Sequence, residues 1–152
     1  HDRQEAFAVG DRIALMRRGK ISQVGAPEEV YSFPCDRFCA EFLGDVNVIS
    51  GTTSDGFFST PFGKFPLGRE IPGAVSALIR PEEITASPDG GGFPARITSV
   101  LYLGDSRVFR VETLDGKTPL LVREYAGIPR RENEIVNLNF RAGKLLNLPE
   151  TR

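Results

Sequence analysis

The sequence predicts a mainly β fold, a small barrel or sandwich, preceded by a short segment of mixed helix and hairpin. Two observations support this prediction. Up to Gly44, apolar residues recur at helical spacing around one hairpin pattern. After Gly44, helical spacing stops and short apolar runs alternate with Gly, Pro and Asp, which is typical of short strands joined by turns. We therefore expect two domains, residues 1–44 and residues 45–152.

Helical and hairpin patterns fill the first domain. Gly10 can end a first helix, and Arg18-Gly19 is the expected hairpin turn. Pro27 suits the first turn of a second helix, and Asp36 is the expected N-cap of a third. The predicted elements are helices over 2–9, 27–31 and 37–43 and strands over 13–16 and 20–24.

Short strands are predicted throughout the second domain. Val136, Leu138 and Phe140 alternate with polar residues, which is the period of a half-buried strand. Asp115-Gly116 is a hairpin turn signal, and flexible loops are expected over 86–94 and 126–134. The predicted strands cover 46–50, 57–59, 64–67, 75–79, 96–103, 108–113, 120–122, 136–140 and 145–148.

Composition limits the possible functions. The 152 residues are 40% hydrophobic and 26% charged, which is typical of a globular protein. The net charge of −1 gives no positive footprint for nucleic acid, whose binding depends on neutralising phosphates. No apolar stretch approaches the roughly 18 residues of a membrane-spanning helix. We therefore expect no nucleic-acid partner and no direct membrane insertion.

Cys35 and Cys39 lie four residues apart, so in a helix they would share one face. We interpret them as reduced thiols that pack as small apolar side chains. A metal pair would need more ligands, and the single histidine, His1, is far away in sequence. We therefore predict no metal site, and two cysteines are too few for a disulfide framework.

Three other patterns have a structural and a functional interpretation. Asp2 and Glu5 share a helical face, either as paired catalytic acids or, as we favour, as acids near a helix start. Residues 90–92, three glycines, could cradle an anion, but we favour a flexible hairpin loop. Base stacking is possible for several phenylalanines, but we favour core or dimer-face packing for Phe57, Phe58, Phe62 and Phe65.

Arg80, Glu82 and Glu83 surround Pro81 at the end of a predicted strand. One interpretation is a contact between the β domains of a dimer, or with a regulator. The other, which we favour, is a strand exit, in which Pro81 keeps Arg80 extended and the two acids begin a helical turn.

The first 44 residues resemble the C-terminal end of the ATP-binding subunit of an ABC importer. The similarity is colinear and without gaps. We expect these residues to belong to a larger domain, since helical pattern begins at once and no initiator Met precedes it. The matching residues are His1-Asp2, Glu5-Ala6, Asp11-Arg12-Ile13, Met16, Gly19-Lys20-Ile21, Gln23, Gly25, Pro27-Glu28-Glu29-Val30-Tyr31, Pro34, Arg37-Phe38 and Ala40-Glu41-Phe42-Leu43-Gly44.

Residues 45–152 resemble the TOBE domain that follows the ATPase in the maltose, polyamine, iron(III) and sulfate importers. This implies an OB-like β-barrel after the α+β tail of a truncated ABC ATPase domain. Within the group we favour the polyamine (spermidine/putrescine) branch, from the Phe42 to Asn47 junction and Leu121-Val122-Arg123; iron(III), sulfate and sugar importers stay open. The matching residues are Asn47, Ile79-Arg80-Pro81-Glu82-Glu83-Ile84, Val100-Leu101-Tyr102-Leu103-Gly104 and Val136-Asn137-Leu138.

The resemblance implies a catalytic role for one residue. His1 falls on the family's switch histidine, which hydrogen-bonds the γ-phosphate of ATP and orients the attacking water, a role that suits an imidazole. ATP and Mg²⁺ are therefore expected in the whole protein. The sequence contains no Gly-x-x-x-x-Gly-Lys-Ser/Thr phosphate loop, so we expect neither a bound cofactor nor ATP hydrolysis from these 152 residues alone.

The resemblance also implies partners and a location. We expect a homodimer that drives membrane permease subunits from the cytoplasmic face of the inner membrane, as a peripheral protein. Two alternatives remain for the β domain: a module that binds a small anion or the transported solute, and an inert structural extension.

Overall fold

The first part of the chain contains three short helices and one hairpin. The computed structural model describes residues 3–66, 76–88, 90–114, 118–125, 127, 129–141 and 146–147. All five elements predicted before Gly44 are confirmed: helices α1 (Arg3–Val9), α2 (Pro27–Ser32) and α3 (Arg37–Leu43), and strands β1 (Ile13–Arg17) and β2 (Lys20–Gly25), which pair antiparallel.

Local chemistry explains where α2 and α3 begin. Pro27 occupies the first turn of α2, where a missing N–H has no consequence. Asp36 has extended backbone, and its Oδ1 accepts a hydrogen bond of 2.8 Å from the backbone N of Cys39, as predicted for an N-cap. A small core lies between these elements, formed by the buried residues Leu15, Val30, Cys39 and Leu43 with Phe7, Ile13, Tyr31 and Phe38 packed against it.

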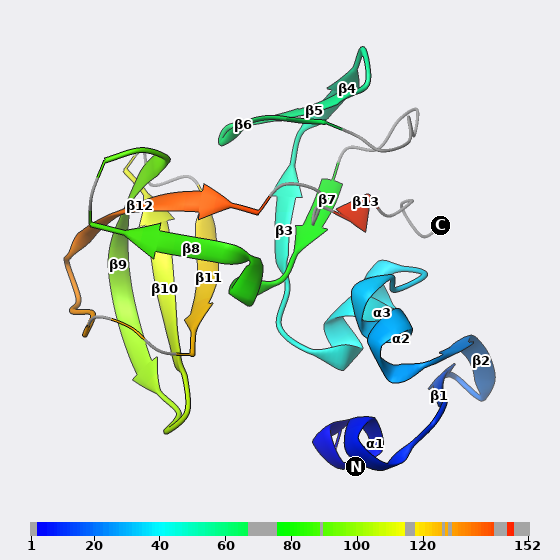
Figure 1. The fold of residues 1–152 in the computed structure, drawn as a ribbon. Coiled ribbons are helices and arrows are strands. Elements are labelled where there is room, and N and C mark those ends of the chain that lie inside the picture. The colour runs from blue at the N-terminus through cyan, green and yellow to red at the C-terminus, as the bar shows by residue number, and fades with distance from the viewer. Residues whose placement is uncertain are drawn as a thin grey trace.

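The second part of the chain is built from strands in three sheets, which confirms the mainly β class (Figure 1). A five-stranded sheet has the order β11-β10-β9-β12-β8, and two three-stranded sheets have the orders β13-β7-β3 and β4-β5-β6. The strands are β3 (Asn47–Ser50), β4 (Thr52–Ser54), β5 (Phe57–Thr60), β6 (Gly63–Pro66), β7 (Ser76–Ile79), β8 (Ile84–Ser87), β9 (Phe93–Tyr102), β10 (Arg107–Thr113), β11 (Pro119–Glu124), β12 (Ile135–Phe140) and β13 (Leu146–Asn147), with the 3-10 helix η1 (Pro81–Glu83) before β8.

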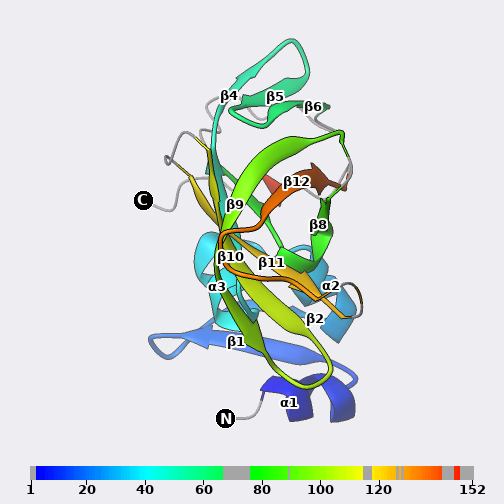
Figure 2. The same cartoon turned by 90° about the vertical axis from the view of Figure 1, so that its left-hand side faces the viewer.

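The five-stranded sheet curls into a half-barrel, consistent with the predicted OB-like TOBE fold (Figures 1 and 2). The register between β9 and β10 shifts between Arg110 and Val111, and such bulges bend a sheet. Its two edge strands, β11 and β8, return towards each other. The concave face holds the main core, which includes Ile97, Phe109 and Leu138, each with no exposed surface.

Two phenylalanines that could have stacked on bases lie in this core instead. Phe58 and Phe62 are 0% and 2% exposed, and the Phe62 ring packs against Phe93 and Phe140. Phe65 packs at the edge of the same core, whereas Phe57 is exposed. Core packing is therefore confirmed for three of the four rings, and dimer-face packing of Phe57 stays a prediction.

The prediction of a loop over residues 86–94 is wrong at both ends. Ile84–Ser87 forms β8 and Phe93–Tyr102 forms β9, so only the middle of the range connects strands. This connection is not a hairpin, because β8 and β9 lie on opposite sides of β12. Gly92 has φ of 88°, and a Cβ there would lie 2.3 Å from the Leu138 carbonyl oxygen, so close backbone approach requires glycine.

Some predictions fall on residues outside those described. These are the Asp115-Gly116 turn and the ends of the strands predicted over 64–67, 75–79 and 145–148. The structure adds β4, which the sequence analysis did not predict. Among the residues that the structure describes, no helix combines the length and the apolar character that crossing a membrane requires.

Candidate functional site

Arg80 connects the first segment to the β part of the chain. It follows β7, and its side chain is buried, with the residue 6% exposed. Its Nη1 donates to the carbonyl oxygens of Ala40, Gly44 and Asp45 at 2.9, 3.1 and 3.1 Å, and its Nη2 donates to that of Tyr31 at 3.4 Å. The last carbonyls of a helix lack partners within the helix, and a guanidinium group can donate to several oxygens at once. Arg80 therefore caps α3 and fixes the chain as it leaves that helix.

Tyr31 lies under this guanidinium group and joins it to a carboxylate. The guanidinium carbon of Arg80 lies 4.2 Å from the ring centroid of Tyr31, within the range of a cation–π contact. The Tyr31 hydroxyl donates a hydrogen bond of 2.5 Å to Oε1 of Glu82. Burial, and then this hydrogen bond, raise the pKa of Tyr31 well above its usual value. The phenol therefore stays protonated as a donor throughout the physiological range.

A cavity of about 340 Å³ opens beside this contact, between the first segment and the β part. Two carboxylates line the cavity, those of Asp45 and Glu82, and Nη2 of Arg123 is 3.6 Å from Oδ2 of Asp45. Its rings and charges suit a small polar ligand. The lining residues are Phe7, Tyr31, Leu43, Gly44, Asp45, Pro81, Glu82 and Arg123.

The predicted site residues divide into three groups. Arg80 and Glu82 meet at this junction, and both are held within the chain. Glu83 points elsewhere, since its Oε2 lies 3.7 Å from Nη1 of Arg141. The extended backbone of Arg80, with φ of −70° and ψ of 145°, and the 3-10 turn after it confirm the predicted strand exit. His1 and Asp2 lie outside the described residues, so the γ-phosphate role of His1 stays a prediction.

The two thiols of the sequence lie together, and the buried one lacks the features of a catalytic cysteine. Cys35 is exposed and Cys39 is buried, and both are free. Burial, and then the hydrogen bonds with Cys35 and Asp36, raise the pKa of Cys39 to about 12. A thiol with a raised pKa is a poor nucleophile at neutral pH, so Cys39 is not a candidate nucleophile.

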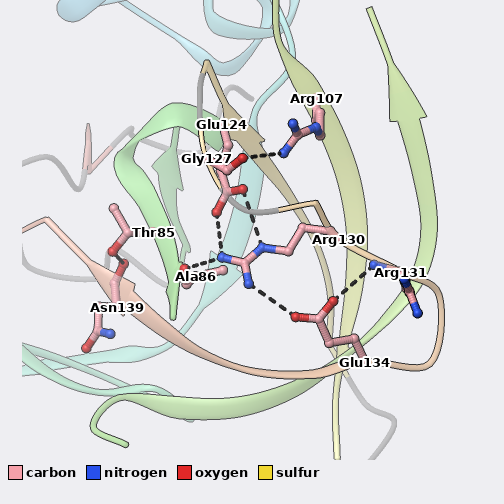
Figure 3. Close-up of polar contacts among 9 residues, drawn as sticks. All are labelled: Thr85, Ala86, Arg107, Glu124, Gly127, Arg130, Arg131, Glu134 and Asn139. Carbon is pink, nitrogen blue, oxygen red and sulfur yellow. Dashed lines mark hydrogen bonds and ion pairs between the residues drawn. The ribbon is translucent and has the colours of Figure 1, made fainter. Parts of the chain in front are cut away.

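The sequence analysis missed a second buried arginine, Arg130, inside the loop predicted over 126–134 (Figure 3). Its side chain is 4% exposed. Its Nη2 donates to the Ala86 carbonyl oxygen at 2.7 Å and to Oε1 of Glu124 at 3.0 Å, and its Nη1 lies 3.2 Å from Oε1 of Glu134. Ala86 belongs to β8 and Glu124 to β11, so Arg130 bridges the two edges of the curled sheet. No local pattern signals this, because an arginine in a polar loop is ordinarily exposed.

Comparison with known proteins agrees with this architecture. Residues 77–148, from β7 to β13, match the family described as TOBE domain. The chain is 36% identical over 122 residues to the Fe(3+) ions import ATP-binding protein FbpC 1 of Rhodococcus jostii, covering 78% of this chain and 35% of that protein.

Two further relatives are named for other solutes. The sulfate/thiosulfate import ATP-binding protein CysA 1 of Chromobacterium violaceum is 40% identical over 123 residues, covering 79% of this chain and 34% of that protein. The spermidine/putrescine import ATP-binding protein PotA 1 of Pseudomonas aeruginosa is 36% identical over 143 residues, covering 86% and 38%. The chain thus spans a little over a third of the length of these relatives.

Proposed function

We propose that this chain belongs with the C-terminal TOBE regions of ABC importer ATP-binding subunits. In this proposal it is the regulatory part of a subunit whose ATP hydrolysis drives solute uptake. The main support for this proposal is the set of hydrogen bonds that the Arg80 side chain donates. It joins the β part to α2 through the Tyr31 carbonyl oxygen and to the end of α3 through those of Ala40, Gly44 and Asp45, so a movement of one part is transmitted to the other.

The proposed division of labour places nucleotide chemistry elsewhere in the whole protein. The 152 residues contain no phosphate-binding loop. We assign to His1 the contact with the γ-phosphate of ATP. In the same proposal the whole protein forms a homodimer, binds permease subunits and works at the cytoplasmic face of the inner membrane. Arg80, Glu82 and Glu83 would transmit dimer or regulatory contacts.

A graft tests the coupling. The chain replaces the aligned region of the Pseudomonas aeruginosa spermidine/putrescine import ATP-binding protein, and ATP-dependent spermidine uptake is measured in cells that lack the original protein. We expect uptake to be restored, and to be lowered by Arg80→Met when uptake is compared per amount of folded subunit. Restored uptake that is insensitive to Arg80→Met would contradict the transmission role and favour an inert extension.

The solute is proposed to be a polyamine. This rests on the junction from Phe42 to Asn47 and on Leu121-Val122-Arg123, and one of the relatives is named for spermidine and putrescine. Deleting the gene in its source organism and measuring uptake of labelled spermidine, iron(III) and sulfate tests it. Selective loss of iron(III) or sulfate uptake would replace the polyamine with that solute.

The cavity supports a second candidate, a ligand-binding module that regulates uptake. Two carboxylates, two aromatic rings and the guanidinium group of Arg123 line it, so it offers partners both to an amine and to an anion. Calorimetric titration of the chain with spermidine, sulfate, molybdate and an iron(III) chelate tests this, with Glu82→Gln as the variant expected to weaken amine binding. No heat and no thermal shift with any of the four would remove this candidate.

A further inference from the structure

Two sulfur atoms face each other where α3 begins. Sγ of Cys35 lies 3.4 Å from Sγ of Cys39. Cys39 has no exposed surface, whereas Cys35 is exposed, so solvent reaches the pair from one side only. The pair is thus preformed and accessible, and both cysteines of the sequence belong to it.

A carboxylate completes a set of three donors. The Sγ atoms of Cys35 and Cys39 and a carboxylate oxygen of Asp36 all lie within 4.8 Å of one another. The N-cap hydrogen bond from the Cys39 backbone N to Oδ1 of Asp36, at 2.8 Å, holds this carboxylate beside the sulfurs. The sequence alone indicated only two sulfurs and a distant histidine, because the carboxylate of an N-cap is ordinarily assigned to the helix.

We propose that Cys35, Asp36 and Cys39 form a binding site for a thiophilic divalent cation of the Zn²⁺ or Cd²⁺ class. Zn–S bonds of about 2.3 Å in a tetrahedral site place two thiolates roughly 3.8 Å apart, so the sulfurs must separate by only about 0.4 Å. Sulfur and carboxylate oxygen are both ligands that Zn²⁺ accepts. Each thiol releases its proton to solvent as the ion binds, and water completes the fourth position.

The site would act on the start of α3. The backbone N of Cys35 donates to Oε1 of Gln23 at 2.8 Å, and Sγ of Cys35 donates to the Ser22 carbonyl oxygen at 3.5 Å. Ion binding removes the thiol proton, so the bond to Ser22 is lost while the backbone bond to Gln23 remains. All three ligands lie within residues 35–39, so a bound ion would tie the residues before α3 to its first turn.

Titration of the reduced chain with CdCl₂ and ZnCl₂ under anaerobic conditions tests the site. We expect ultraviolet thiolate-to-cadmium charge-transfer absorption that saturates at one ion per chain. Native mass spectrometry should show one bound Zn²⁺, and both thiols should become protected from a thiol reagent. MgCl₂ should produce none of these changes.

Three variants distinguish a specific ion-binding site from nonspecific binding of metal ions by thiols. Cys35→Ser should abolish saturable binding, and its exposed position leaves the fold intact. Cys39→Ser should do the same, and Asp36→Asn, which keeps an N-cap acceptor, should weaken binding by roughly tenfold. Absence of charge-transfer absorption in the reduced chain, or equal absorption in Cys35→Ser, would overturn the proposal. A pair that forms a disulfide in air but binds neither ion would overturn it as well.

Discussion

The guanidinium carbon of Arg80 lies 4.2 Å from the ring centroid of Tyr31, a residue 49 positions earlier in the chain, and Nη2 of Arg80 donates to the Tyr31 carbonyl oxygen as well. The ring in turn holds Glu82 through its hydroxyl group. The residues on either side of Pro81 are thereby both bound to the same tyrosine. This makes the junction between the first segment and the β part a single unit of stacking and hydrogen bonding, and the first predictions concern it.

Replacing Arg80 should destabilise the chain strongly. Arg80→Met leaves the carbonyl oxygens at the end of α3 without their donor, so we expect the free energy of unfolding to fall by about 3 kcal/mol. Arg80→Lys should recover only part of this loss, because an ammonium group cannot stack and bond in one plane. Urea denaturation measures both, with Arg96→Lys, an exposed arginine on β9, as the control. Equal stability of Arg80→Lys and the unchanged chain would contradict the planar contact.

Tyr31→Phe should alter stability in a pH-dependent way. At neutral pH the variant loses the hydrogen bond to Glu82, which should cost about 1.5 kcal/mol. The pKa of Tyr31 is raised in the folded chain, whereas in the unfolded chain it is about 10. The unfolded state therefore binds fewer protons above pH 10. The contribution of Tyr31 is complete below that pH and declines above it.

Other groups also titrate at high pH. The difference in free energy of unfolding between the unchanged chain and Tyr31→Phe isolates the contribution of Tyr31. We expect the gap in the free energy of unfolding to be constant from pH 7 to about 10 and to narrow above it. Tyr102→Phe, at a ring that is 67% exposed, is the matched control and should show no gap. A gap that widens with pH would mean that the phenol is not held protonated.

Arg130→Met should open the curled sheet at its edges. The substitution leaves the buried end of Glu124 without its partner and removes the donor to the Ala86 carbonyl oxygen, for an expected loss of about 3 kcal/mol. Arg131→Met is a close control, because Arg131 is exposed and its hydrogen bonds to Glu134 are made by its backbone N and O. Hydrogen exchange should locate the change in β8 and β11. A loss spread evenly over the chain would contradict the bridging role.

Prediction from the sequence succeeded where the cause of structure is local. Asp36 was expected to cap α3, and the bond from the Cys39 backbone N to its carboxylate is present. The alternation of Val136 and Leu138 with polar neighbours placed β12, and both side chains are fully buried. Capping and strand period depend on residues within a few positions, so one sequence is sufficient to identify them.

The failures have a non-local cause. Ile84–Ser87 forms a strand because β12, more than fifty residues later, provides its partner. Arg80 was interpreted as part of a strand exit, which is correct for its backbone, but its side chain bonds to residues about 40 positions away. Arg130 lies in the polar loop predicted over 126–134, and its burial depends on partners in β8 and β11. Such partners leave no periodic signal in a single sequence.

Asn47 offers a sharp test of how the β part is assembled. It is 5% exposed. Its Nδ2 donates to the Leu121 carbonyl oxygen at 2.8 Å, and its Oδ1 accepts from the Leu121 backbone N at 2.7 Å. The amide side chain thus pairs with β11 as a neighbouring strand would, and it joins β3 in one sheet to β11 in another. Only Asn fits, because one donor and one acceptor are required at the end of a short side chain.

Asn47→Asp should therefore destabilise the chain, although the two side chains are nearly equal in size. The carboxylate still accepts from the Leu121 backbone N, but it faces the Leu121 carbonyl oxygen without a proton to donate, and we expect a loss of about 2 kcal/mol at pH 7. Burial and the carbonyl dipole should raise the pKa of the new carboxyl group, so protonation restores the donor and the loss should shrink as the pH falls towards 4. Urea denaturation of both chains from pH 7 to 4 measures this. An equal loss at every pH would show that the paired geometry at Leu121 is not what holds β3 to β11.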